Sequence, residues 1–482
     1  MPETPQAAIA RAAVHYRAGD FDAAAQCGLE IVAQVPDHFD ALHLLGVLCL
    51  NRGQSADAAN YLTRAARSAS RNTQSCLNLG NAWLALKCSQ RAEAAFRHAL
   101  TFETDCVDAL IGLGIALTEK NQMDEGIAAY RAALAHQPNH AAIHFNLGKA
   151  LVALDRRDEA LESYRAALVC APPDMPAARI VDILHSLGGV LVDLDRPEEA
   201  LALFDAEQAR RSVPLALDWN RSLLQLQIGD YAAGWRSYES RWAVEGHDKP
   251  RPDSTIIDLS CVAGQRILLT GEQGRGDIVQ FVRYAPLLAE CGATVYLSVY
   301  DDLKRLLCDM PSIAKVFGED ENLPPYDLAT PLLSLPLAFG TTIDTIPACV
   351  PYLRADADRV AAWHEKFGPN PGRRVGLTWS STNPGAARST DLARLRPLLD
   401  CSDISFHAIQ KEINPDDLEF IRKGGRVRDH RADLSDFAET AAAIEALDLV
   451  IAIDTGVAHL AGALGKPVWI ILPHVAEWRW LR

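Results

Sequence analysis

The sequence predicts an all-α array of helical repeats followed by an α/β region with two parallel-sheet halves. Two observations support this prediction. A Leu-Gly pair recurs every 34 residues in the first half, and short β-rich runs alternate with helical stretches in the second. With 482 residues, the chain is long enough for two or three domains. We divide it into a repeat array at 1–245, a linker at 246–265, and α/β halves at 266–368 and 369–482.

The repeat array is defined by glycines that lie 34 residues apart, at Gly46, Gly80, Gly114 and Gly148. A small residue follows twelve positions after each glycine, a large residue four further on, and an alanine three after that. This pattern resembles the tetratricopeptide repeat, a helical hairpin whose small residues allow close approach while large residues fill the gap between units. Weaker units at both ends bring the count to about seven.

A single helical hairpin cannot bury its apolar face, so the units are expected to stack into a continuous array. The stacked array offers a groove for a protein or peptide partner. A spacer or a dimerisation surface is the alternative. The sequence leaves open whether the repeats also pair two copies of the chain.

Composition excludes several classes of protein. The net charge of −15 argues against nucleic acid as the main ligand, because backbone binding needs clustered Lys and Arg. The eleven cysteines form no C-x-x-C pair, which argues against zinc and suits a reducing compartment. Neither a signal peptide nor a membrane span is recognisable. We expect a cytoplasmic protein without a bound metal.

The first α/β unit has a clear order of elements in the sequence. It begins with a strand at Arg266–Thr270, a glycine-rich loop at 271–277, a helix at Ile278–Cys291 and a strand at Thr294–Val299. The loop reads G-x-x-G-x-G, which differs from the dinucleotide pattern G-x-G-x-x-G and disfavours a nicotinamide cofactor.

The second half contains four further strands, at Arg373–Trp379, Ser405–Gln410, Leu447–Ile453 and Val468–Leu472. A helix at Val457–Leu464 lies between the last two of them. Ligands of such sheets bind at the carboxyl ends of the strands, so we expect a cleft between the two halves.

The run from Asp454 to Leu464, Asp-Thr-Gly-Val-Ala-His-Leu-Ala-Gly-Ala-Leu, resembles the heptosyltransferase-like glycosyltransferases of family nine. The chain looks most like bacterial proteins that carry tetratricopeptide repeats ahead of such a domain. The loop at 271–277 and the segments Asp327–Pro336, Pro351–Leu353 and Trp478–Trp480 also fit, in the same order.

The resemblance implies a GT-B fold and metal-independent, inverting transfer of a sugar to an acceptor hydroxyl. The co-substrate would be a nucleotide-sugar, and no cofactor is implied. The repeats would recruit the acceptor, which would be a protein, a peptide or an envelope component. Related proteins continue beyond the position of Arg482, so the resemblance also implies that the second half is incomplete.

The resemblance places the general base at Asp277, which would remove the proton of the acceptor hydroxyl. Asp277 followed by Gln280 also has the pattern of a helix N-cap with a capping-box partner, and both roles stay open. The neighbouring residues of the loop are expected to support the site or to orient the acceptor: Glu272, Gln273, Gly274 and Gly276.

The donor is expected at the junction of strand and helix near Thr455 and Gly456, where free backbone N–H groups suit a diphosphate. His459 lies near the same end and is expected to bond the donor, with a packing role as its alternative. Asp454 is expected to fix the turn.

Further donor contacts are expected from basic and acidic residues that follow two other strands. The resemblance places Arg388 near the donor phosphates and Lys411 with Glu412 beside the donor. For Lys411 and Glu412, a solvated charged turn is the alternative. A rival function also stays open: a tetratricopeptide interaction scaffold whose glycosyltransferase-like domain is inactive or only senses a ligand.

Overall fold

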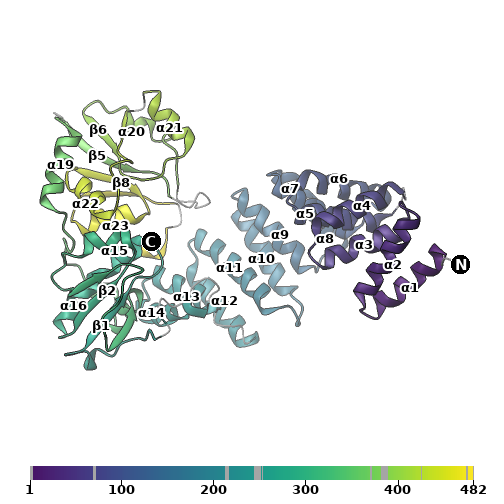
Figure 1. Ribbon diagram of the computed structural model, residues 1–482, viewed down its shortest axis with the longest axis horizontal. Coiled ribbons are helices and arrows are strands. Elements are labelled where there is room, and N and C mark those ends of the chain that lie inside the picture. Colours follow the sequence, from purple (N-terminus) through teal and green to yellow (C-terminus); the bar gives the residue numbers. More distant parts are fainter. Residues whose placement is uncertain are drawn as a thin grey trace. The chain divides into compact units, whose positions relative to one another are not determined.

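The computed structural model describes residues 4–68, 72–211, 216–243, 251, 253–369, 372–381, 389–424, 426–473 and 476–480. The chain forms two compact units, Met1–Val213 and Pro214–Arg482, and each is described by itself. Figure 1 shows helices throughout the first unit and strands only in the second. The predicted fold class, helical repeats followed by an α/β region, is confirmed.

The first unit is a series of antiparallel helical hairpins whose neighbouring helices pack in chain order. Its described helices are α1 (Pro5–Arg17), α2 (Phe21–Gln34), α3 (Phe39–Asn51), α4 (Ser55–Ser68), α5 (Thr73–Ala85), α6 (Ser89–Phe102), α7 (Val107–Glu119), α8 (Met123–His136), α9 (Ala141–Ala153), α10 (Arg157–Val169), α11 (Ala177–Asp193) and α12 (Pro197–Arg211).

The recurring glycines lie where a large side chain crosses the helix. A Cβ atom added at Gly80 would lie 2.5 Å from the ring of Phe96, and one at Gly114 would lie 2.4 Å from Tyr130. Phe96 also presses on Gly112 of the next unit, where an added Cβ would lie 2.3 Å away. The large residue therefore packs on the glycine of its own hairpin as well as between units.

Helix α11 offers a direct test of this packing because it holds two adjacent glycines. A Cβ at Gly188 would lie 2.7 Å from Phe204 Cζ, whereas Gly189 has no atom within 4 Å. We expect Gly188→Ala to lower the free energy of unfolding by about 1–3 kcal/mol through overpacking. Gly189→Ala is expected to raise it by up to about 1 kcal/mol through helix propensity. Urea denaturation of both variants checks this, and equal effects would contradict the packing role.

The seventh repeat hairpin belongs to the second unit. It comprises α13 (Ala216–Gln227) and α14 (Tyr231–Tyr238), followed by the 3₁₀ helix η1 (Glu239–Ala243). Trp235 of α14 packs edge-on against Phe281 and Trp478, with ring centroids 5.9 and 5.4 Å away. The array predicted for 1–245 is thus divided, since its last hairpin shares the core of the α/β region.

The predicted linker at 246–265 lies partly outside the described residues, because 244–250 and 252 are not described. Its second part does not behave as a linker. The N–H of Thr255 donates to the carbonyl of Ala329 at 2.9 Å, and Ile257 and Val262 are buried. This part of the linker prediction was wrong, because the segment adds to the first sheet and fills its core.

The first sheet is entirely parallel, with strand order β3-β2-β1-β4. Its strands are β1 (Arg266–Thr270), β2 (Thr294–Ser298), β3 (Lys315–Phe317) and β4 (Leu328–Pro331). Its helical segments are η2 (Leu259–Cys261), α15 (Arg275–Phe281), η3 (Val282–Tyr284), α16 (Ala285–Glu290), α17 (Asp301–Leu307), η4 (Leu332–Ser334), α18 (Leu335–Ala338) and η5 (Ile343–Thr345). The sequence predicted β1 and β2 but missed the short strands β3 and β4.

The helix predicted at Ile278–Cys291 starts three residues earlier and is broken in the middle. A 3₁₀ turn, η3, separates α15 from α16. Pro286 lies in the first turn of α16, and because proline has no N–H it cannot continue the hydrogen bonds of the helix before it.

The second sheet is also entirely parallel, with strand order β7-β6-β5-β8-β9. Its strands are β5 (Arg373–Thr378), β6 (Ile404–Ala408), β7 (Val427–Asp429), β8 (Leu449–Ile453) and β9 (Val468–Ile471). The accompanying helices are α19 (Ala357–Phe367), α20 (Arg396–Leu399), α21 (Pro415–Arg422), α22 (Phe437–Glu445), α23 (Gly456–Ala463) and the 3₁₀ helix η6 (Trp478–Trp480).

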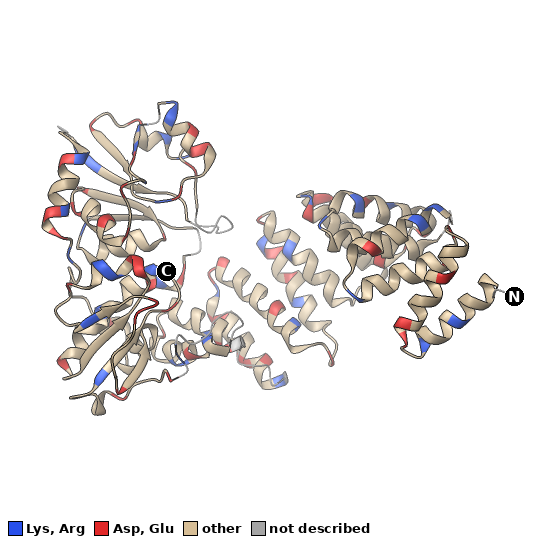
Figure 2. Ribbon diagram, in the orientation of Figure 1, with Lys and Arg blue, Asp and Glu red and all other residues tan. Residues whose placement is uncertain are grey.

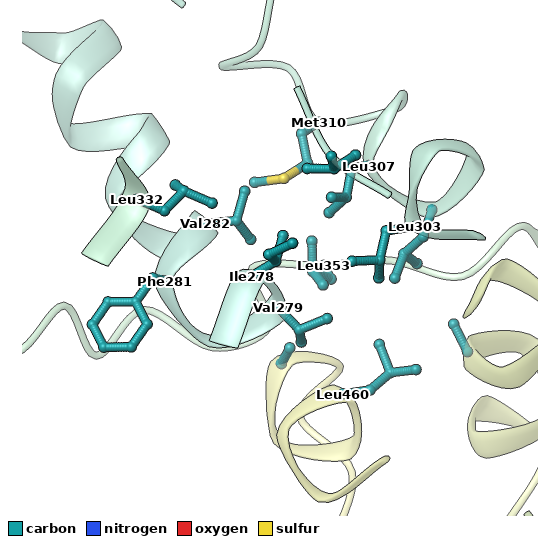
Figure 3. Packing of buried hydrophobic residues seen from close by; sticks show 14 of the residues in the cluster. Ile278, Val279, Phe281, Val282, Leu303, Leu307, Met310, Leu332, Leu353 and Leu460 are labelled. Carbon is teal, nitrogen blue, oxygen red and sulfur yellow. The ribbon is translucent and has the colours of Figure 1, made fainter. Parts of the chain in front are cut away.

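One hydrophobic cluster joins the two α/β halves. Val279 of α15 and Leu460 of α23 are both buried and belong to this cluster (Figure 3). The segment around Tyr352 reinforces the junction, since its N–H donates to the carbonyl of Ala463 at 3.0 Å and its hydroxyl to that of Val279 at 3.1 Å. Helices α15 and α23 are therefore fixed to each other.

A buried histidine pair lies within the second half. His407 Nδ1 is 3.0 Å from His430 Nε2, and the ring of Phe367 packs 4.2 Å from that of His407. Burial, with the positive charges of Arg428 and Arg374 and the neighbouring His430, lowers the pKa of His407 to about 3. Both rings are thus held neutral, because charging either of them would bury a cation.

This pair predicts a loss of stability in acid. An unfolded histidine has a pKa of about 6.5. The folded state disfavours the charged form, so stability is complete above that pH and falls as the pH drops from about 6.5 towards 3. The expected slope is up to about 1.4 kcal/mol per pH unit. His407→Gln does not titrate and is expected to show a shallower slope in urea denaturation between pH 7 and 4, whereas an unchanged slope would refute the assignment.

Candidate functional site

A cavity of about 750 Å³ opens in the second unit between the ends of strands from both sheets. Residues after β1, β5, β6 and β8 line it, so it lies at the carboxyl ends of these parallel strands, as expected. The predicted residues that line it are Gln273, Gly274, Gly276, Asp277, Lys411, Glu412, Asp454, Thr455, Gly456 and His459.

The floor of the cavity is formed where the first turns of α15 and α23 meet. A Cβ at Gly276 would lie 3.0 Å from His459 Cδ2 and 3.1 Å from the Cα of Gly456. A side chain at Gly276 would press on the backbone of α23, so the glycine allows the two helices to approach this closely. It brings the two loops predicted to carry the site into direct contact.

Asp277 lies at the third position of α15. Its Oδ2 accepts a hydrogen bond from the N–H of Gly274 at 3.0 Å, and its Oδ1 pairs with the guanidinium of Arg479. The helix begins after Gly274, so the capping box predicted for Asp277 and Gln280 is wrong: Asp277 reaches back to cap the helix start instead. Its carboxylate remains 15% exposed.

Glu272, predicted to orient the acceptor, is buried and does not line the cavity. Its carboxylate forms two hydrogen bonds of 2.9 Å with Arg241 and accepts the N–H of Leu333 at 3.1 Å. Burial raises the pKa of Glu272, and Arg241 opposes that rise. Glu272 thus anchors the loop to the seventh repeat hairpin.

Gln273 connects the same hairpin to the cavity. Its side-chain amide donates to the hydroxyl of Tyr238 at 3.1 Å, and its carbonyl accepts from the hydroxyl of Tyr300 at 2.8 Å. Its φ of +58° is in the left-handed region, which asparagine and glycine adopt more readily than glutamine.

The turn after β8 presents the start of α23 to the cavity. The N–H groups of the first helical turn have no acceptor within the helix, so those of Gly456 and Val457, which line the cavity, are available to an anion. The hydroxyl of Thr455 donates to the carbonyl of Ile453 at 3.4 Å.

His459 is 10% exposed and stacks on Trp480, with ring centroids 5.2 Å apart. Its Nε2 lies 3.8 Å from Asp454 Oδ1. Burial, followed by the charge of Arg479, lowers the pKa of His459 to about 4, while Asp277 and Asp454 oppose this shift. His459 is therefore neutral near pH 7 and can both donate and accept a hydrogen bond.

The segment after β6 forms the opposite wall. Gln410 is buried and its Oε1 accepts the N–H groups of Trp379 and Ser380, at 2.8 and 3.2 Å. Lys411 extends from this anchored turn and donates to the carbonyl of Ser435 at 3.2 Å. The carbonyl of Glu412 accepts from Gln410 at 2.8 Å. Arg388 lies outside the described residues.

Sequence reasoning assigned no role to several residues that line the cavity. Arg275 pairs with Asp302 at 3.1 Å, and Arg479 pairs with both Asp277 and Glu477. Arg479 belongs to the Trp-Arg-Trp run that was noted for its resemblance alone. The available signal was that Arg479 lies between two tryptophans, in a segment that fits the resemblance to family nine.

A smaller cavity of about 280 Å³ adjoins the first on the side of the seventh repeat hairpin. Its walls include Trp219 and Leu223 of α13, Tyr238 of α14, and Trp478. Gln273, Glu477 and Arg479 line both cavities, so they form a shared boundary beside Asp277.

Two features are absent from the part of the chain that the structure describes. No group of three His, Cys, Asp or Glu side chains there could hold a metal ion. Every helix there is too short or too polar to span a bilayer. Figure 2 shows that basic and acidic residues are interspersed in both units.

Family comparisons match two parts of the chain. Residues 43–105 and 111–174 match the tetratricopeptide repeat. Residues 434–471 match glycosyltransferase family 9, described as heptosyltransferase. The second match covers α22, β8, α23 and β9, and so includes Asp454, Thr455, Gly456 and His459 of the cavity.

Among curated proteins, the chain is similar to Protein FlbA of Caulobacter vibrioides, with 27% identity over 308 residues. The match covers 56% of this chain and 51% of FlbA, so the chain spans about half the length of that relative.

Solved structures match the repeats. A structure of MamA from Desulfovibrio magneticus, from residue 41 to the end, is 23% identical, with a TM-score of 0.32, over 36% of this chain and 94% of that solved chain. YrrB, described as a tetratricopeptide protein with an unusual peptide-binding site, is 19% identical, with a TM-score of 0.34, over 36% of this chain and 88% of YrrB.

Proposed function

The chain joins tetratricopeptide repeats to a segment of glycosyltransferase family nine, and on that premise we propose that it transfers a sugar from a nucleotide-sugar to an acceptor hydroxyl. One observation carries the proposal. The family-nine segment forms a wall of the larger cavity, and Asp277 lies in the same cavity on the opposing helix. We further propose that the two α/β halves form a GT-B fold and that the protein is cytoplasmic.

The donor diphosphate would bind at the start of α23. The free N–H groups of Gly456 and Val457, together with the positive end of the helix dipole, favour an anion there. Lys411 brings a cation to the facing wall. Arg388 keeps its proposed role near the donor phosphates. His459 would donate a hydrogen bond to the donor as a neutral ring.

Asp277 would act as the general base. The acceptor oxygen attacks the anomeric carbon as its proton passes to the Asp277 carboxylate, and the bond from that carbon to the diphosphate oxygen breaks. The nucleoside diphosphate leaves with the bonding electron pair. A single displacement from the opposite face inverts the anomeric configuration. Cationic side chains would offset the charge on the leaving group, so no metal ion is proposed.

The acceptor would reach Asp277 through the smaller cavity. Its aromatic walls come from α13, α14 and η6, and its boundary with the larger cavity is beside the proposed base. In this proposal the seventh repeat hairpin holds the acceptor at the reaction centre. The acceptor would be a protein, a peptide or an envelope component.

The test is titration of the full chain with a panel of nucleotide-sugars by calorimetry, followed by turnover assays with and without EDTA. We expect one donor to bind, with affinity reduced at least tenfold in Lys411→Ala, which removes the cation that faces the proposed diphosphate site. We also expect turnover to be unchanged by EDTA. A folded chain that binds no donor would overturn the proposal and favour the interaction scaffold.

A further inference from the structure

The repeat unit contains a groove between α4 and α6, with α5 as its floor, and its volume is about 810 Å³. The floor presents Cys76, Leu79 and Trp83 from one face of α5. Ala59 of α4 and Ala95 of α6 line the walls, where their side chains are small. The base of the groove is thus apolar and can receive an aliphatic or aromatic side chain.

The rim of the groove is basic. Arg64 and Arg67 of α4 lie on one wall, and Arg91 and His98 of α6 on the other. No Asp or Glu is among the described residues that line it. A basic surface is unusual in a chain with a net charge of −15, and it favours an anionic partner.

Two residues of the groove, Arg91 and Trp83, depart from the repeat pattern. At the positions 34 and 68 residues after Arg91 the chain has Glu125 and Glu159, and after Trp83 it has Leu117 and Leu151. Stacking of the units depends on the residues that recur, such as the glycines. Arg91 and Trp83 do not recur, so the stacking does not require them.

Glu125 and Arg91 occupy equivalent positions in two repeats, but their side chains have different partners. Glu125 is committed to an ion pair with Arg97 at 3.3 Å, as part of the contacts between units. Arg91 instead lies over the ring of Trp83, with its guanidinium carbon 4.6 Å from the ring centroid. This stacking holds the guanidinium at the mouth of the groove, where its edge can face a carboxylate.

From these features we infer that the α4–α5–α6 groove binds an acidic peptide segment. An apolar side chain of the peptide occupies the floor on Leu79 and Trp83. Its Asp or Glu side chains pair with Arg67 and Arg91 on the two walls. The floor is mainly aliphatic with a single tryptophan, whereas single-stranded nucleic acid needs several aromatic rings for stacking. An acidic peptide therefore fits better than an oligonucleotide.

The experiment uses the full chain and a fluorescein-labelled twelve-residue peptide of Asp and Glu with one central Phe and one Leu. Fluorescence anisotropy gives Kd at two salt concentrations, without any nucleotide-sugar, so its outcome is independent of sugar transfer. We expect saturable binding that weakens as salt increases.

Two variants borrow the residues of later repeats, which keeps them compatible with the fold. Trp83→Leu and Arg91→Glu are each expected to raise Kd at least tenfold, with the helical circular dichroism unchanged. Arg17→Glu makes the same charge change at an exposed site on α1 and is expected to leave Kd within twofold. An unlabelled peptide with Phe and Leu replaced by Ser is expected to compete poorly.

Three results would overturn the inference. The first is absence of peptide binding by the folded chain, and the second is equal loss of binding in Arg17→Glu and Arg91→Glu. The third is displacement of the peptide by a twelve-residue oligothymidylate at lower concentration than by the unlabelled peptide, which would assign the groove to nucleic acid.

Discussion

Replacing Asp277 by asparagine is expected to lower kcat by about 100- to 10,000-fold, the usual contribution of a general base. The amide oxygen of asparagine can still accept the hydrogen bond from the N–H of Gly274, so the start of α15 is kept. Donor affinity is expected to stay within threefold, because the proposed diphosphate site lies on α23. The measurement is kcat with saturating donor and acceptor, alongside donor Kd by calorimetry.

Asp302 provides the matched control. It lines the same cavity, carries the same carboxylate and pairs with an arginine, Arg275, at 3.1 Å. Asp302→Asn is expected to keep kcat within about threefold of the parent chain. If Asp277→Asn retains turnover, or if both variants lose it equally, Asp277 is not the base.

Removing the carboxylate of Glu272 is expected to destabilise the second unit by about 3–5 kcal/mol, as the loss of one partner of a buried ion pair does. Glu272→Ala leaves Arg241, which is fully buried, with Glu239 as its remaining carboxylate partner. It also leaves the N–H of Leu333 without the acceptor it has now. Urea denaturation followed by tryptophan fluorescence measures the change.

Two further variants separate the buried charge from packing. Glu272→Leu combined with Arg241→Met and Glu239→Gln removes all three charges, including the second carboxylate partner of Arg241, and is expected to recover most of the lost stability. Glu321→Ala removes a carboxylate of a surface ion pair with Lys304 and is expected to leave stability unchanged. If this triple variant is no more stable than Glu272→Ala, the loss is due to packing and the ion-pair argument fails.

The elements with strong local patterns were predictable from the sequence. The 34-residue period identified the hairpins, and apolar runs identified β1, β5 and β8 to within two residues. The strand β7, only three residues long, was missed because so short a run carries no periodicity. The break between α15 and α16 was also missed, although Pro286 marked it.

The lining of the candidate site was predictable where its residues are neighbours in sequence. Thr455, Gly456 and His459 lie in one motif, and all three line the cavity. The partner of Asp277 is 202 residues away, at Arg479, and no local pattern links the two. Glu272 was misjudged for the same reason, since its role depends on Arg241 in a different predicted domain.

Because the seventh hairpin belongs to the second unit, not every hairpin of such a chain is equally free to be gained or lost in evolution. Copies can be gained or lost among the earlier hairpins, because each contacts mainly its neighbours. The last hairpin has no such freedom, since Trp235 and Arg241 fill the interior of the α/β region. Descendants that differ in array length are therefore expected to inherit α13 and α14 together with the α/β region, as one indivisible module.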